Sequence, residues 1–185
     1  MGLAQRSGLT DVPLLEQTIG DNLAETVAEH GDRLALVVRH QGVRWSYAEF
    51  AAEVDRVARG LLGAGIEVGD RVGIWSPNHV EWVLTQYATA KVGAILVCVN
   101  PAYRAHELSY VLRQSGCRML VSATEHKGSD YRAMVDECRD DLPALECTIY
   151  IGTSDWDDLL ADGADVTAED LVERTAALSP TDPIN

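Results

Sequence analysis

One stretch, residues 71–103, constrains the fold more than any other part of the sequence. It contains two short apolar runs, at 72–75 and 94–99, and turn residues bound each run as they bound buried strands. Between the runs, apolar residues recur at the spacing of an amphipathic helix, which Gly93 ends. A strand, a helix and a strand in this order form a βαβ unit. Such a unit crosses over with a right hand and places its two strands parallel in one sheet.

The segments after this unit repeat the same alternation. A helix is predicted at 105–114, a strand at 119–122, a helix around 130–139 and a strand at 148–151. An acidic loop should follow, and then a last helix that begins at Thr167. The residues that define this loop are Asp155, Asp157, Asp158, Asp162 and Asp165. The alternation predicts an α/β fold in which a mostly parallel sheet carries helices on both faces.

The part of the chain before the central unit is expected to contain an arm, two helices and a hairpin. Residues 1–17 are predicted to form an extended N-terminal arm, and residues 22–30 a first helix. Apolar runs at 34–39 and 43–45, joined by a turn at Gln41-Gly42, predict a β-hairpin. The hairpin is the one antiparallel element that we expect.

Polar residues and glycines predict where the helices begin and end. Asp21, Ser46 and Asn78 are each expected to cap a helix, Ser46 and Asn78 with a glutamate three residues later. Residues 76–79 also leave a strand at the edge where ligands bind, but capping is the favoured interpretation. Gly63 and Gly65 resemble part of a dinucleotide-binding fingerprint. They close a helix and precede a strand, however, which is the reverse of that motif, so we interpret them as a helix end.

Composition excludes several classes of protein. The chain has 185 residues, of which 46% are hydrophobic and 24% charged, as in globular rather than disordered proteins. The formal net charge of −14 argues against nucleic acid or an anionic membrane as a partner. The four cysteines lack metal-site spacing, and Cys98 lies in an apolar run where a buried, reduced thiol is expected. The first twenty residues lack the apolar core of a signal peptide, and no run has transmembrane length. We therefore predict a cytoplasmic protein without an integral membrane segment.

A series of short motifs gives the sequence a resemblance to a known family. In chain order they are Gly31-Asp32, Ala35-Leu36, Trp45-Ser46-Tyr47-Ala48-Glu49, Gly69-Asp70-Arg71-Val72, Ser76-Pro77-Asn78, Glu81-Trp82, Gly93-Ala94, Asn100-Pro101-Ala102-Tyr103 and Glu107-Leu108. In this order and spacing, they resemble the N-terminal region of the acyl-CoA synthetases, which belong to the adenylate-forming (AMP-binding) enzymes. The resemblance covers residues 18–185 and is closest to the fatty-acid–CoA ligases of that family.

The resemblance implies an enzyme that uses ATP, Mg²⁺ and coenzyme A. Members of the family convert a carboxylic acid and ATP to an acyl-adenylate and pyrophosphate, and then pass the acyl group to the thiol of CoA. The Gly/Ser/Thr-rich phosphate-binding loop of the family, with its lysine, is not in this sequence, which ends where that loop is expected to begin. Residues 18–185 are therefore expected to be an incomplete α/β subdomain of the family's larger N-terminal domain.

Such a fragment should behave differently from a full-length ligase. It is expected to form no acyl-adenylate and to bind neither ATP, Mg²⁺ nor CoA tightly, because the groups that hold phosphates are absent. It is also expected to self-associate through core surface that the rest of the enzyme would cover. The sequence does not specify the length of the fatty acid.

Four residues are the candidates for contact with substrate or CoA. Asn100 and Tyr103 follow a predicted parallel strand, at the carboxyl edge where open α/β sheets bind ligands. The alternative is structural: Asn-Pro forms a turn, and Tyr103 packs on the next helix. Lys127 and Arg132 follow the strand at 119–122, where basic residues of some relatives contact the nucleotide phosphates of CoA. Either cation could instead be a solvated side chain. No residue is proposed to be catalytic or to bind a metal.

Two other functions fit the same alternation of elements. One is a stand-alone flavodoxin-like module that binds a ligand, although the sequence has no loop that cradles phosphate. The other is a non-catalytic interaction protein that uses the acidic C-terminal segment. A reading frame that continues into a Gly/Ser/Thr-rich loop followed by lysine would favour the ligase, and a natural stop codon would favour the alternatives.

Overall fold

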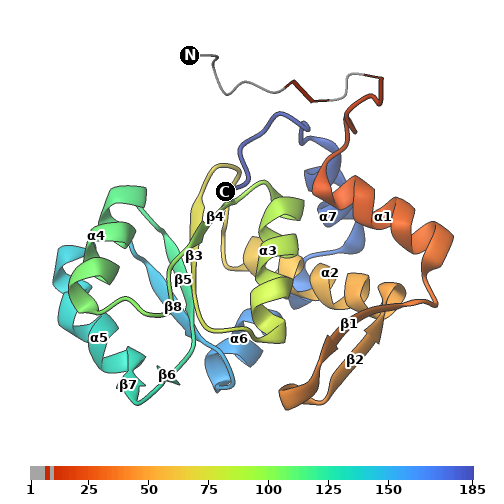
Figure 1. Cartoon of the computed structure of the whole chain (residues 1–185). Helices are drawn as coiled ribbons and strands as arrows, with labels where there is room; N and C mark the ends of the chain where they lie inside the picture. The colour runs from red at the N-terminus through yellow and green to blue at the C-terminus, as the bar shows by residue number, and fades with distance from the viewer. Residues whose placement is uncertain (1–6, 9–10) are drawn as a thin grey trace, which may run out of the picture.

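The fold is built on one parallel sheet of four strands with helices on both faces (Figure 1). The computed structural model describes residues 7–8 and 11–185. Its α-helices are α1 (Ile19–His30), α2 (Tyr47–Gly63), α3 (Val80–Val92), α4 (Ala105–Ser115), α5 (Tyr131–Cys138), α6 (Ser154–Asp162) and α7 (Ala168–Ala176). Its strands are β1 (Leu34–Val38), β2 (Val43–Ser46), β3 (Arg71–Trp75), β4 (Ile95–Cys98), β5 (Met119–Ser122), β6 (Glu125–His126), β7 (Ser129–Asp130) and β8 (Cys147–Tyr150).

The central sheet has the strand order β4-β3-β5-β8, and every neighbouring pair is parallel. In the β3–β4 pair, Arg71 lies opposite Ile95. The predicted α/β fold with a mostly parallel sheet is thus confirmed. On the outer side of β4, the amide of Leu96 donates to the carbonyl of Ile184 at 2.9 Å. The prediction that Cys98 is buried is wrong: its side chain is exposed, because it stands at the end of β4, the edge strand of the sheet among the described residues.

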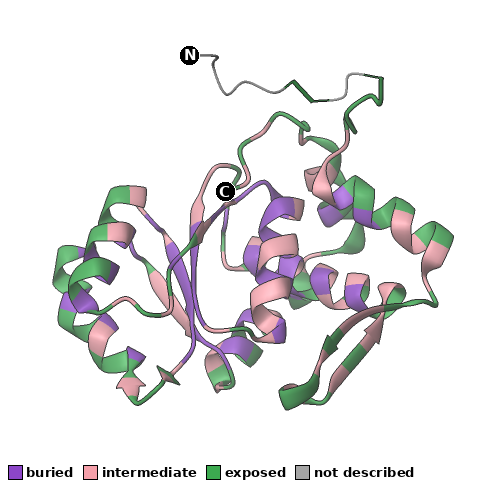
Figure 2. Ribbon diagram, viewed as in Figure 1, coloured by how far each residue is buried: buried purple, intermediate pink, exposed green. Residues whose placement is uncertain are grey.

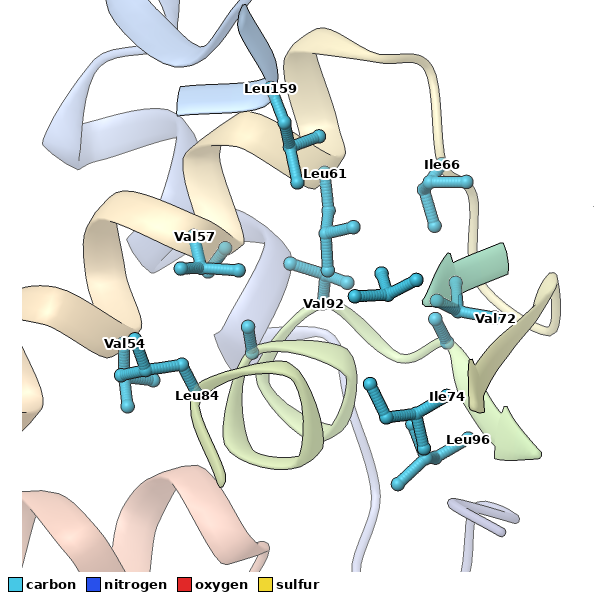
Figure 3. Packing of buried hydrophobic residues seen from close by; sticks show 14 of the residues in the cluster. Val54, Val57, Leu61, Ile66, Val72, Ile74, Leu84, Val92, Leu96 and Leu159 are labelled. Carbon is cyan, nitrogen blue, oxygen red and sulfur yellow. The ribbon is translucent and has the colours of Figure 1, made fainter. Parts of the chain in front are cut away.

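The side chains of β3 alternate between two apolar layers. Val72 and Ile74 are fully buried in the layer that includes α2, α3 and α6, in the same apolar cluster as Leu61 and Leu159 (Figure 3). Trp75 is fully buried in the other layer, which the sheet forms with α4 and α5. Figure 2 shows the buried residues gathered along the strands and on the sides of the helices that face them. A strand covered on both faces has a continuous apolar sequence, as the run at 72–75 has.

Two of the three predicted helix caps were wrong. Ser46 caps α2, and the capping box includes a 2.8 Å bond donated by its amide. Helix α1 begins earlier than expected because Thr18 is its cap, and Asp21 occupies the third helical position of the capping box. Asn78 does not cap α3. The cap position belongs to His79, whose side chain makes no capping bond within the described part of the chain.

Glycines in α2 allow α6 to approach this helix closely. A Cβ atom on Gly60 would lie 2.4 Å from the carbonyl oxygen of Leu159, and one on Gly63 would lie 1.9 Å from that of Asp162. Gly63 is the last residue of α2, and Gly65 follows in the left-handed region with φ of 80°. These glycines therefore serve the end of the helix and its packing, which agrees with the helix-end interpretation.

The prediction of an acidic loop at 155–165 was wrong, because most of this segment is helical. Helix α6 covers the first part, and a 3₁₀ helix (Gly163–Asp165) follows it. Trp156 and Leu159, three residues apart, are buried on one side of α6, and the side chain of Thr153 accepts a capping bond from Asp155 at 3.2 Å. A single buried face is enough to stabilise this helix, although four of its nine residues are acidic.

The N-terminal part of the chain lies beside the sheet rather than in it. Strands β1 and β2 form the predicted antiparallel hairpin, which packs against α2 (Figure 1). The predicted arm, residues 1–17, is described at residues 7–8 and 11–17, and this part contains no helix or strand. The boundary between arm and domain stays a prediction. No helix among the described residues is long and apolar enough to cross a membrane.

Candidate functional site

The carboxyl edge of the sheet is the candidate site, because the direction of the chain reverses across it. From β3 the chain passes through α3 to β4, on one side of β3. From β4 it passes through α4 to β5, on the other side. The carboxyl ends of β3 and β5 are therefore neighbours from which the chain leaves to opposite faces. Ligands of open α/β sheets bind at such a switch point.

Asn100 and Tyr103 lie in the turn that follows β4. The carbonyl of Asn100 accepts bonds from the Tyr103 amide at 3.0 Å and from Trp75 Nε1 at 3.1 Å. The Asn100 side chain accepts from the amide of Ala102 at 2.9 Å, which shapes the turn. Tyr103 packs partly buried against the α4–α5 layer. Both residues thus have the structural roles that were the alternative, while the Asn100 side chain remains exposed at the edge.

A buried aromatic pair packs next to the switch point, in the layer formed with α4 and α5. The rings of Trp75 and Tyr131 are stacked, with centroids 3.6 Å apart and planes at 5°. The Tyr131 hydroxyl donates to the carbonyl of Pro101 and so joins α5 to the turn after β4. Burial raises the pKa of the Tyr131 hydroxyl, which therefore stays protonated and remains a donor at neutral pH.

Lys127 occupies the tip of a small hairpin that the sequence did not predict. The hairpin consists of β6 and β7, and its central residues Lys127 and Gly128 have φ of 49° and 77°. Among the described residues, Lys127 is the only non-glycine residue with positive φ. This conformation is unfavourable for a lysine, and it places an exposed ammonium group beyond the carboxyl end of β5. Arg104 links this hairpin to the turn after β4 by a hydrogen bond to Ser129.

The side chain of Arg132 already has partners. Its guanidinium carbon is 4.0 Å from the centre of the Tyr150 ring, and Nη2 is 3.9 Å from Asp155 Oδ2. Burial raises the pKa of Tyr150 to about 12, with a further contribution from the nearby Asp136 carboxylate, so the ring that Arg132 covers is neutral. Arg132 is thus engaged with β8 and α6. In contrast, the hydrogen bonds from Tyr131 to Pro101 and from Arg104 to Ser129 join the turn that contains Asn100 to the segment that contains Lys127.

The loop after β3 contains functional groups that the sequence did not single out as a group. Ser76, which is 3% exposed, has its Oγ 2.9 Å from His79 Nδ1 and donates to the carbonyl of Pro77 at 2.8 Å. The ring of His40, from the tip of the β1–β2 hairpin, lies edge-on to the His79 ring at 5.4 Å. Gln41 follows it in this tip. The contact between this hairpin tip and the loop after β3 could not be predicted from the sequence, because the two segments are some forty residues apart and no local pattern connects them.

Side chains at this edge can attract an anion and form hydrogen bonds. Exposed Lys127 supplies positive charge, and the loops supply amide and imidazole groups. In the described ranges, residues 7–8 and 11–185, no group of three or more His, Cys, Asp or Glu side chains could hold a metal ion. Whether the four predicted residues contact a ligand stays a prediction.

Comparisons with known proteins agree on one family. The profile of the AMP-binding enzyme family matches residues 23–185. The chain is 38% identical over 203 residues to the mouse protein named medium-chain acyl-CoA ligase ACSF2, mitochondrial. This alignment covers all of this chain but only 33% of the mouse protein. The human protein of the same name is 47% identical over 130 residues, which cover 70% of this chain and 21% of the relative. The chain thus spans a third or less of the length of these relatives.

Solved structures of similar fold bear related names. The N-terminal domain of FACL13 from Mycobacterium tuberculosis has a TM-score of 0.67 and 26% identity, over 90% of this chain and 38% of that one. The long-chain-fatty-acid-CoA ligase FadD1 from Archaeoglobus fulgidus has a TM-score of 0.70 over all of this chain and 34% of its own. Its 19% identity shows a shared fold alone. Neither alternative function, the flavodoxin-like module or the non-catalytic interaction protein, finds support in these comparisons.

Proposed function

This chain belongs to the AMP-binding enzyme family, and we propose that it is the N-terminal part of an ATP-dependent fatty-acid–CoA ligase. The observation that carries the proposal is the 38% identity, over the whole chain, to a protein named as an acyl-CoA ligase. The reaction is the formation of an acyl-adenylate and pyrophosphate from a carboxylate and ATP. The thiol of CoA then takes the acyl group and releases AMP.

Within this enzyme, we propose that the carboxyl edge of the sheet borders the nucleotide end of CoA. The chemistry of the edge fits such a group, since an exposed ammonium attracts phosphate and an exposed amide can bond a base. Lys127 is the stronger candidate of the two predicted cations because Arg132 already faces Asp155 and Tyr150. Asn100 and Tyr103 would contribute from the neighbouring turn. When bound, CoA supplies the thiol that accepts the acyl group.

The adenylation chemistry itself would depend on groups that this sequence does not contain. Transition-state charge on a phosphate is stabilised by donors aimed at it, and removing even one typically costs about 10²–10³ in rate. The sequence has no Gly/Ser/Thr-rich phosphate loop with its lysine. Mg²⁺ would neutralise phosphate charge in the full-length enzyme. We therefore propose that these 185 residues alone are inactive.

Exchange of labelled pyrophosphate into ATP tests the proposal, with fatty acids of several lengths. A protein that carries this chain and has the length of the relatives should show acid-dependent exchange, and the isolated chain should not exceed a sample without protein. Exchange by the isolated chain would contradict the proposal that these residues alone are inactive. Absence of exchange and of acyl-CoA in the longer protein would contradict the ligase function itself.

A charge reversal tests the CoA edge separately. Lys127→Glu in the longer protein should raise the KM for CoA about tenfold, because attraction to phosphate becomes repulsion. The matched control is Arg113→Glu, which makes the same charge change on an exposed position of α4. Equal KM values for CoA in the two variants would remove Lys127 from the site.

We also propose that the isolated chain self-associates and that it resides in a reducing compartment such as the cytoplasm. Apolar side chains around α7 support the first point, since Val68 is 56% and Val172 67% exposed. Light scattering at rising protein concentration tests self-association, and a monodisperse monomer would contradict it.

The four cysteines, all free thiols in the described chain, support the proposed location in a reducing compartment. Imaging of the tagged protein decides between the cytoplasm and the mitochondria for which the relatives are named.

A further inference from the structure

The first turn of α3 is capped by a side chain from another part of the molecule. Gln41 Oε1 accepts a hydrogen bond from the amide of Val80, the first residue of the helix, at 2.6 Å. Gln41 Nε2 donates to Glu81 Oε2 at 2.8 Å. One primary amide thus satisfies a helix-end donor and an acidic side chain of the same turn. Only a side chain with both an acceptor and a donor at its end can form this bridge.

The fold of the hairpin places Gln41 for this role. Gln41 is the last residue of the 3₁₀ helix Arg39–Gln41, which joins β1 to β2, and Gly42 follows with φ of 69°. The left-handed residue turns the chain back into β2, so Gln41 projects from the tip of the hairpin. In Figure 1 this tip lies at the same end of the molecule as the start of α3. The hairpin, which is outside the main sheet, therefore reaches the carboxyl edge of β3.

The segment that Gln41 fixes is the loop at the switch point. His79 lies between the bridged helix turn and the buried Ser76, and its Nδ1 is 2.9 Å from Ser76 Oγ. The Ser76 hydroxyl also donates to the Pro77 carbonyl at 2.8 Å, so the serine joins the imidazole to the backbone of the loop. The ring of His40 contacts that of His79 from the hairpin side. The hairpin thus contacts the loop at two points: Gln41 binds the first turn of α3, and His40 contacts the imidazole of His79.

From these contacts we infer that Gln41 is a positioning residue: it holds the loop at 76–79 in the conformation that ligand binding at the carboxyl edge requires. The inference rests on the proposed function, because CoA is the ligand that we expect at this edge. Gln41 touches no substrate in this scheme and acts only through Val80 and Glu81. A shift of about 1 Å in such a supporting element can cost about a hundredfold in rate, so the effect of losing the bridge should be measurable.

Substitution Gln41→Glu tests the bridge with an internal rescue. At pH 8 it places a second carboxylate against that of Glu81, and two such groups repel each other. At lower pH, the introduced carboxyl gains a proton, which it can donate to Glu81 while its carbonyl oxygen accepts from Val80. The bridge is then restored. His40 and His79 also lie near this site, so the unsubstituted protein is measured at each pH. Gln114→Glu adds the same charge on an exposed position of α4 and is the matched control.

The first measurement uses the chain itself. Hydrogen exchange of the Val80 amide, relative to the unsubstituted chain, should be at least tenfold less protected in Gln41→Glu at pH 8 and should recover by pH 5. The second measurement uses the longer protein, in which Gln41→Glu should raise the KM for CoA about tenfold at pH 8 and less at pH 6. A KM equal to that of Gln114→Glu, or a KM that stays high at pH 6 while Val80 regains protection, would overturn the inference. If the unsubstituted longer protein forms no acyl-CoA, the proposed function fails, whereas unchanged protection of Val80 would overturn the role of Gln41 on its own.

Discussion

The two edges of the central sheet differ in one cationic side chain, Lys127, which lies exposed at the carboxyl edge. At the amino edge, Arg71 donates hydrogen bonds to three backbone carbonyl oxygens, at 3.0 to 3.1 Å. These oxygens belong to Gly69, Ser115 and Gly116. Arg118 is bound at the same edge by two carboxylates and a carbonyl oxygen, which belong to Asp70, Glu146 and Gly65. Both guanidinium groups therefore join loops to one another and have little capacity left for a ligand.

At the carboxyl edge, Arg104 and Arg132 also have partners, but Lys127 differs from them. Lys127 stands at the tip of a two-residue turn in an unfavourable backbone conformation. Strain in a folded protein persists where function or neighbouring structure requires it. The number of basic residues at an edge therefore does not identify a binding site. What distinguishes a structural basic residue from a candidate for ligand binding is whether its hydrogen-bonding groups already have partners in the protein. Substitutions at the amino edge should therefore change stability, and substitutions at the carboxyl edge should change ligand binding.

The largest effect should come from Arg71→Met at the amino edge. Methionine keeps much of the aliphatic stem but leaves three carbonyl oxygens without their donor, and the free energy of unfolding should fall by about 3 kcal/mol. Urea denaturation measures this loss. Arg113→Met on exposed α4 is the control and should change it by less than about 0.5 kcal/mol. Similar losses in the two variants would mean that the amino edge is not tied together by Arg71.

The second effect is a dependence of stability on pH at the amino edge. Burial opposes ionisation of Asp70, but hydrogen bonds from the Glu67 amide and from Arg118 outweigh it and hold its pKa below the ordinary value. A lowered pKa in the folded state stabilises the protein above the unfolded pKa of about 4, and this contribution is lost as pH falls through the folded pKa. Asp70→Asn should cost about 1.5 kcal/mol at pH 7, a value limited by solvent around the pair.

Denaturant titrations of both proteins between pH 7 and pH 2 measure this effect. The difference between Asp70→Asn and the unsubstituted chain should shrink as the pH falls below about 4, because protonated Asp70 resembles asparagine. A difference that stays constant over the whole range would show that the charge of Asp70 does not stabilise this edge.

The sequence predicted the interior of the sheet well because the signal there is local. The run at 72–75 is apolar on both faces since β3 is covered on both faces, and Gly93 and Ser46 end and begin helices through bonds to residues near them in sequence. Cys98 was misplaced because no residue near it in the sequence indicates that β4 is the edge strand of the sheet in the part of the chain that the structure describes. Strand order depends on pairings between distant segments.

The candidate site was predicted less well for the same reason. The prediction that Asn78 caps α3 was based on local spacing, whereas Gln41 performs this function from the hairpin. The turn Lys127-Gly128 lacks the Asn-Gly or Asp-Gly signal by which such hairpins are recognised. Asn100 and Tyr103 were predicted from their place after a parallel strand, and Lys127 and Arg132 from a resemblance; the structure adds that Arg132 is separately engaged. Tertiary contacts decide which polar groups at this edge remain available.

The third effect tests how the carboxyl edge is supported. Tyr131→Phe keeps the stacked ring on Trp75 but removes the hydroxyl that donates to the Pro101 carbonyl. The free energy of unfolding should fall by about 1 kcal/mol. Because the same bond joins α5 to the turn with Asn100, the amide signals of that turn should shift in NMR spectra. Unchanged signals around Asn100 would mean that the aromatic stack alone supports the turn.

The smallest change in stability should have the opposite sign. Lys127→Gly removes the side chain that makes φ of 49° unfavourable, a penalty of about 1–2 kcal/mol for an L-residue. The greater entropy of unfolded glycine offsets about 0.5–1 kcal/mol of this gain. The free energy of unfolding should therefore rise by about 0.5 kcal/mol, while the KM for CoA of the longer protein rises because the ammonium is lost. Lys127→Arg, which keeps both the charge and the strain, should change neither quantity appreciably, and Lys127→Asn should behave like the glycine variant because asparagine tolerates this conformation. Urea denaturation of the chain and CoA kinetics of the longer protein measure the two quantities. If Lys127→Gly loses stability, the turn is held by the lysine side chain rather than strained by it, and the contrast between the two edges would not hold at this residue.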